Sequence, residues 1–103
     1  MRLILCALTF FTFTLYADNW PMWRGATGLG LTHEKTLPQQ WNATKNIAWK
    51  IELPSRGNST PIVWGEKIFL TQPLEEQNER ALICMDRLDG KILWQRTVKY
   101  TDT

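Results

Sequence analysis

The chain has 103 residues, which is room for one small domain at most. Its formal net charge is +2 and the charged residues are dispersed, which excludes the basic footprint of a nucleic-acid-binding protein. Six tryptophans are the main departure from ordinary composition. Because tryptophan is a large apolar side chain with a single donor, we expect it to pack in the core, and stacking on sugars or other flat ligands is the alternative.

Residues 1–17 have the layout of a secretory signal peptide. A positive start at Arg2 precedes an apolar run from Leu3 to Leu15, and Ala17 is a small residue before the polar Asp18. The run is shorter than the ~20 apolar residues that a membrane span requires. We therefore predict an exported protein, periplasmic or extracellular, that is cleaved after Ala17 and has no membrane span after cleavage.

Cleavage at this site would leave Cys84 as the only cysteine. Cys6 lies near the start of the apolar run, whereas a lipid-modified cysteine follows such a run, so the sequence does not predict a lipoprotein. Cys84 lies in the apolar stretch 81–85 and has no partner for an internal disulfide. We predict a buried, inert thiol rather than a nucleophile.

Residues 18–46 show neither helical nor strand periodicity, and glycines and prolines interrupt them. This composition predicts an irregular N-terminal arm with turns. The arm holds His33, the only histidine of the chain. A second histidine for a zinc site is therefore missing, and the sequence offers no serine–histidine–acid pattern.

From residue 47 the pattern changes to short β-runs. Residues 47–53 alternate apolar and polar side chains, which predicts a strand with one apolar face. Four further strands are predicted over 60–64, 67–71, 81–86 and 91–98. Together these four form an antiparallel meander.

The connections between these strands carry turn signals. Gly65-Glu66, with glycine first, predicts a type II′ hairpin turn. Asp89-Gly90 marks the last hairpin. Residues 72–80 are polar and include three glutamates, so we predict a solvated loop.

An internal match suggests a repeat. Residues 47–53 and 92–98 both carry isoleucine, then tryptophan two positions later, then an aliphatic residue four positions after that. The copies lie 45 residues apart, and propeller blades of four strands repeat at ~40–50 residues. We therefore expect Trp49 and Trp94 to share the apolar parity of their strands and to be buried in the seams between blades.

This repeat defines the expected organisation of the chain. Residues 47–98 would start a β-propeller, with 47–53 as the outer strand of a neighbouring blade and 60–98 as the first full blade. Residues 99–103 stop without a closing element. Since one sheet leaves two faces uncovered, and repeat folds need at least ~3 units, we expect the N-terminal part of a longer polypeptide that carries the remaining blades.

Four segments carry a family resemblance. Residues 85–94 (Met-Asp-Arg-Leu-Asp-Gly-Lys-Ile-Leu-Trp) resemble the repeat of pyrroloquinoline-quinone-like (PQQ-like) β-propellers, with an aspartate, a glycine-lysine turn and a tryptophan in that order. Residues 46–50 and 59–65 are similar to strands that open such a propeller, and residues 20–25 look like the mature start of exported bacterial members. Asp89 stands where the repeat usually has threonine, and aspartate suits the same turn.

The resemblance implies the fold better than the activity. The group contains quinone-dependent dehydrogenases and also propellers that bind no quinone, including an outer-membrane assembly scaffold. A dehydrogenase would need a calcium site of ~6–8 oxygen ligands and an aspartate base. Asp86 and Asp89 are the only close aspartate pair, and we expect both to cap the hairpin. We assign no catalytic, cofactor-binding or metal-binding residue.

Three functions remain open on the sequence. The favoured one is a non-catalytic binding or scaffold module at the bacterial cell envelope, with a protein or envelope component as partner. The alternative is a PQQ-dependent alcohol or sugar dehydrogenase, with its site in blades outside these residues. Carbohydrate binding through exposed tryptophans is the third.

Overall fold

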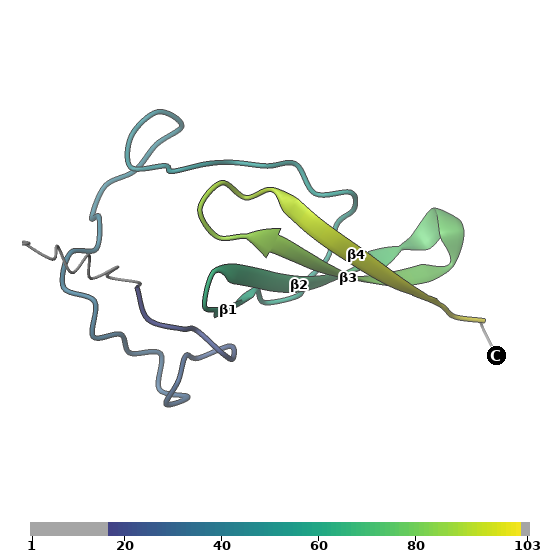
Figure 1. Cartoon of the computed structure of the whole chain (residues 1–103), viewed down its shortest axis with the longest axis horizontal. Helices are drawn as coiled ribbons and strands as arrows, with labels where there is room; N and C mark the ends of the chain where they lie inside the picture. The colour runs from purple at the N-terminus through teal and green to yellow at the C-terminus, as the bar shows by residue number, and fades with distance from the viewer. Residues whose placement is uncertain (1–16, 102–103) are drawn as a thin grey trace, which may run out of the picture.

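A computed structural model describes residues 17–101, so the signal peptide predicted over 1–17 lies outside the described residues except for Ala17. The described chain forms one antiparallel sheet of four strands, in the order β1-β2-β3-β4 (Figure 1). The strands are β1 (Ile62–Trp64), β2 (Lys67–Leu74), β3 (Glu79–Asp86) and β4 (Ile92–Lys99). This result confirms the predicted all-β class and the meander.

The β1–β2 hairpin has the predicted two-residue connection. Trp64 pairs with Lys67 across it. Gly65 has a φ of 58°, whereas Glu66 is not among the residues with positive φ. A type II′ turn requires positive φ at its first central residue alone, which glycine adopts without strain.

The prediction of a loop over residues 72–80 is wrong at both ends. β2 continues to Leu74 and β3 starts at Glu79, so the connection consists of a 3-10 turn η1 (Glu75–Gln77) and Asn78 in a left-handed conformation. Residues 72–74 pair with residues 79–81 of the next strand. The polar composition of this stretch suggested solvent, but the side chain of Gln72 is buried.

Pro73 lies inside β2 even though proline cannot donate a ladder hydrogen bond. The backbone N–H of Thr71 donates to Ser59 Oγ at 3.0 Å, on the side of β2 away from β3. Residues two apart in a strand direct their N–H groups to the same side. The nitrogen of Pro73 therefore faces the edge beyond the short β1, where residues 17–101 place no strand that would accept a hydrogen bond from it.

The core lies on one face of the sheet. It is built by Leu70 of β2 and by Ala81, Ile83 and Met85 of β3, all buried. Ile51 and Leu53 of the preceding segment pack against it. We call the face that carries these residues the covered face.

The segment 47–53 makes no ladder hydrogen bonds among the described residues, so the strand predicted there is not formed. The predicted alternation does hold over its second half. Trp49, Ile51 and Leu53 are half-buried, whereas Lys50 and Glu52 are exposed. Figure 1 shows this segment as part of a long irregular stretch that passes around the sheet before returning to β1.

Gln72 fastens the end of this segment to the sheet. Its side-chain oxygen accepts a hydrogen bond from the backbone N–H of Ser55 at 3.1 Å, and its side-chain nitrogen donates to the Ser55 carbonyl at 2.6 Å. A buried amide that is satisfied on both sides costs little, whereas an unsatisfied one is destabilising. This reciprocal pair therefore fixes the position at which the segment leaves the covered face.

The position of the core predicts that two neighbouring residues of β3 contribute very differently to the free energy of unfolding. Ile83 is 0 % exposed, and Leu82, on the opposite face, is 40 % exposed. We expect Ile83→Ala to lower the free energy of unfolding by ~2–5 kcal/mol, because the cavity cannot collapse fully. Leu82→Ala is the control and should cost clearly less. Denaturant unfolding of both variants tests this, and equal losses would show that the covered face is not the core.

Candidate functional site: a docked tryptophan and an open sheet face

The β3–β4 connection is a tightly hydrogen-bonded turn. The Asp86 N–H donates to the Lys91 carbonyl at 2.8 Å, and the Gly90 N–H donates to the Asp86 carbonyl at 2.9 Å. Asp86 Oδ1 accepts from the Leu88 N–H at 2.7 Å, and Asp89 Oδ1 accepts from the Lys91 N–H at 2.9 Å. The structure thus confirms that both aspartates cap the turn, and their carboxylates serve the backbone there.

Trp49 is seated on this turn. Its Nε1 donates a hydrogen bond to the carbonyl of Arg87 at 2.9 Å. Its ring lies against Gly90, so that a Cβ built on Gly90 would come within 2.7 Å of Trp49 Cδ2 and Cζ3. Gly90 also has a φ of 73°. Glycine is therefore required twice, once by the backbone and once by the indole ring.

Arg87 connects this turn to the neighbouring β1–β2 turn, which lies at the same end of the sheet, a role that the sequence did not reveal. Its N–H donates to the Glu66 carbonyl at 2.9 Å. Its guanidinium Nη1 donates to the carbonyls of Gly65 at 3.2 Å and Ala17 at 3.1 Å. The docking position of Trp49 is thereby fixed relative to the β1–β2 hairpin.

Trp94, the repeat equivalent of Trp49, lies on the other face of the sheet. A register shift in the β3–β4 pairing puts Ile92 opposite Met85 and Trp94 opposite Cys84, with Leu93 as the extra residue. Ile92 therefore belongs to the covered face, and Trp94 does not. The simple alternation that placed both on one face is wrong at this bulge.

We call this second face the open face and define it by Phe69, Leu82, Trp94 and Val98. The rings of Phe69 and Trp94 lie 6.1 Å apart at 55°, and Cys84 pairs with both residues across the sheet. Cys84 is fully buried there, as predicted. Trp94 is only half-buried and Val98 is 66 % exposed, so the seam burial expected for Trp94 is incomplete among the described residues.

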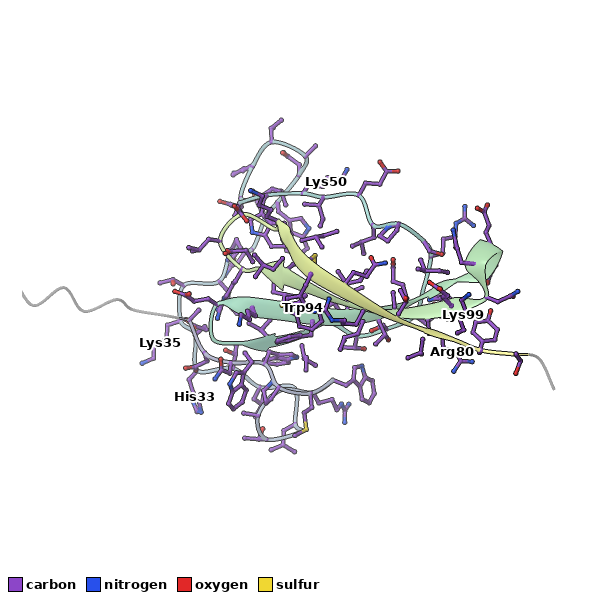
Figure 2. All side chains as sticks on the ribbon, turned by 45° about the vertical axis from the view of Figure 1, so that its right-hand side comes forward. His33, Lys35, Lys50, Arg80, Trp94 and Lys99 are labelled. Atoms are coloured by element: carbon purple, nitrogen blue, oxygen red, sulfur yellow. The ribbon has the colours of Figure 1, made fainter. Side chains whose placement is uncertain are left out.

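Guanidinium groups border the open face. The Arg96 guanidinium lies 5.7 Å from the ring centroid of Trp94, and that of Arg80 lies 5.1 Å from the ring of Tyr100. Figure 2 shows Trp94 near the middle of the sheet, with Arg80 and Lys99 towards the end of β4. Tryptophan, tyrosine and arginine are the residue types enriched where proteins bind one another most strongly.

The fold does not bring the remaining candidate site residues together. His33 is exposed on the arm, and Glu75 and Glu76 are exposed on η1. Residues 17–101 contain no cluster of three histidine, cysteine, aspartate or glutamate side chains placed to hold a metal ion. Within the same range, no helix has the length and apolar character needed to cross a membrane.

Comparisons with known proteins add no identity. No family model matches the chain. Neither the curated proteins nor the solved structures gave a match. The docked tryptophan and the open face are therefore the features from which a function can be inferred.

Two glycines with positive φ provide a test of the docked tryptophan. A Cβ on Gly65 would meet nothing within 4 Å, whereas one on Gly90 would collide with Trp49. Gly65→Ala should cost ~1–2 kcal/mol from backbone strain alone. Gly90→Ala should cost the same strain and a further ~1–3 kcal/mol from overpacking.

The background variant Trp49→Ala separates these two terms. Without the indole ring, Gly65→Ala and Gly90→Ala should reduce the free energy of unfolding by similar amounts. Denaturant unfolding of the four glycine variants measures the difference. If Gly90→Ala kept its extra cost in the Trp49→Ala background, Trp49 would not be the cause of the glycine requirement.

Proposed function

We propose that this chain is a PQQ-like β-propeller repeat unit that serves as a non-catalytic binding or scaffold module at the bacterial cell envelope. One observation carries the proposal: Trp49, in the first copy of the internal repeat, is docked on the turn that precedes Trp94, in the second copy. A contact between successive copies of a repeat is what propagates a repeat architecture. Trp94 would dock in the same way on an equivalent turn.

The residues on the two faces of the sheet support packing of one repeat copy against the next. Trp49, Ile51 and Leu53 are turned towards the sheet, the last two onto the covered face. Their equivalents in the second copy are Trp94, Arg96 and Val98. The side chains of Trp94 and Val98 belong to the open face, where Trp94 is half-buried and Val98 is 66 % exposed among the described residues. We infer that the open face packs against the covered side of another sheet.

Because of Arg96, the contact proposed for the second copy of the repeat differs chemically from the contact that the first copy makes. It replaces the aliphatic Ile51 of the first copy, and its guanidinium lies over Trp94. A guanidinium stacked on an indole can be buried more readily than a lysine ammonium, because it is weakly hydrated. The partner surface would still need an acceptor for its N–H groups. We therefore expect a partner that combines an apolar surface with carbonyl or carboxylate oxygens.

Site-specific photo-cross-linking tests this proposal. Trp94 is replaced by p-benzoylphenylalanine in cells that produce the protein, and Trp41, which is 66 % exposed on the arm, receives the same substitution as a matched control. We expect efficient cross-links from position 94 to a peptide with an aspartate and a glycine ordered as in the turn 86–91. Equal yields at both positions, or products lacking such a turn, would contradict repeat packing.

The envelope location makes a separate prediction. Export with cleavage after Ala17 should give a mature N-terminus at Asp18, within a residue or two. Mass spectrometry of the protein recovered from the envelope or the medium measures this terminus. A cytoplasmic protein that retains Met1 would contradict the location without affecting the packing argument.

A further inference from the structure

A small cavity lies between the N-terminal arm and the β1–β2 hairpin. Its volume is about 270 Å³, and its lining includes Asp18, Asn19, Thr27, Thr32, His33 and Trp64. Pockets for drug-sized ligands measure ~300–1,000 Å³, so this cavity would accommodate about one ring. Trp64 lies on the same side of the sheet as Phe69, but the cavity shares no lining residue with the open face or with the turn that holds Trp49.

Hydrogen bonds donated by backbone N–H groups hold the walls of the cavity in place. Trp20 and Val63 exchange two hydrogen bonds, at 2.9 and 2.8 Å, which attach the arm to the edge of β1. The Gly65 N–H donates to Asn19 Oδ1 at 2.6 Å. The Asp18 N–H donates to Glu34 Oε1 at 2.8 Å, next to His33. Three chain segments are thus joined around one hollow.

Trp64 gives the cavity an aromatic wall that is open to ligands. It is 61 % exposed, although it belongs to a strand. The other indole of the lining, Trp20, is already engaged, because its ring lies against Gly25, where a Cβ would come within 2.7 Å of Cζ3. A flat apolar surface of this kind suits the C–H face of a sugar ring.

The polar groups opposite this wall both donate and accept. Asn19 uses its side-chain oxygen for Gly65, which leaves its amide N–H groups available. Thr27, Thr32 and His33 add hydroxyl and imidazole groups, and Asp18 adds a carboxylate. A sugar has neighbouring hydroxyls that each donate and accept, which such a mixed lining satisfies.

We propose that this cavity binds a neutral pyranose sugar, with its ring stacked on Trp64 and its hydroxyls hydrogen-bonded to Asp18 and Asn19. The lining contains no lysine or arginine side chain to balance the charge of a phosphate or other anion, and the carboxylate of Asp18 would repel one. A quaternary ammonium ligand needs several aromatic faces around it, and Trp64 alone is open here.

The test follows the indole N–H signals of the full chain by nitrogen-correlated NMR during titration with methyl glycosides of glucose, galactose, mannose and N-acetylglucosamine. Trp64→Phe identifies the Trp64 signal by its loss. We expect at least one glycoside to shift that signal in a saturable manner, with a dissociation constant on the order of 1 mM. Trp64→Ala should weaken this binding about five- to tenfold.

Two further variants keep the test decisive. Trp41→Ala removes an indole of similar exposure outside the cavity and should bind as the parent does. Asp18→Asn keeps the backbone N–H that contacts Glu34 and should weaken binding without unfolding the chain, even if Trp64→Ala fails to fold. The proposal is overturned if no glycoside shifts the Trp64 signal, if choline shifts it and glycosides do not, or if Trp41→Ala weakens binding as much as Trp64→Ala.

Discussion

The contact between the indole of Trp49 and the bare backbone at Gly90 is the constraint on which the rest of the structure depends. The turn must offer a free carbonyl at Arg87, a residue without a side chain at Gly90, and a conformation fixed by the two aspartates. When these conditions hold, Ile51 and Leu53 follow Trp49 onto the covered face. The segment then closes the core without contributing a strand.

The two outer edges of the sheet are protected from pairing with other strands in different ways. The arm pairs with β1 through Trp20, and the hydroxyl of Ser59 accepts the free N–H of Thr71 beyond the end of β1. The outer edge of β4 has no such cover among residues 17–101, but the strand carries Arg96 and Lys99 and no acidic residue. Charge of one sign discourages two such edges from pairing, which is a common protection against aggregation.

Much of this fold could be predicted from local sequence. The glycine-first turn at Gly65, the capping aspartates and the four strands depend on neighbours only a few residues away, so the pattern contained them. The end of β2 could not be found in this way, because the burial of Gln72 is decided by Ser55. The bulge at Leu93 was equally hidden, since alternation gives no sign of an inserted residue.

The candidate sites also differ in how far they could be predicted from local sequence. The roles of Asp86 and Asp89 follow from turn chemistry and were predictable. The docking of Trp49, the link through Arg87 and the cavity beside Trp64 join residues that are far apart in the sequence. The repeat indicated that Trp49 mattered, but only the structure shows which backbone groups receive it.

The distance along the chain between Trp49 and Arg87 also has a consequence for how the molecule assembles. The hydrogen bond between them closes a loop of 38 residues, whereas the hairpins of β2, β3 and β4 join adjacent parts of the chain. Closing long loops costs more entropy than closing short ones, so contacts between neighbouring segments form first. The meander would therefore form the turn at residues 86–91 before Trp49 docks on it. The segment 47–53 would then be the last part of the molecule to pack on the covered face and the first to detach from it.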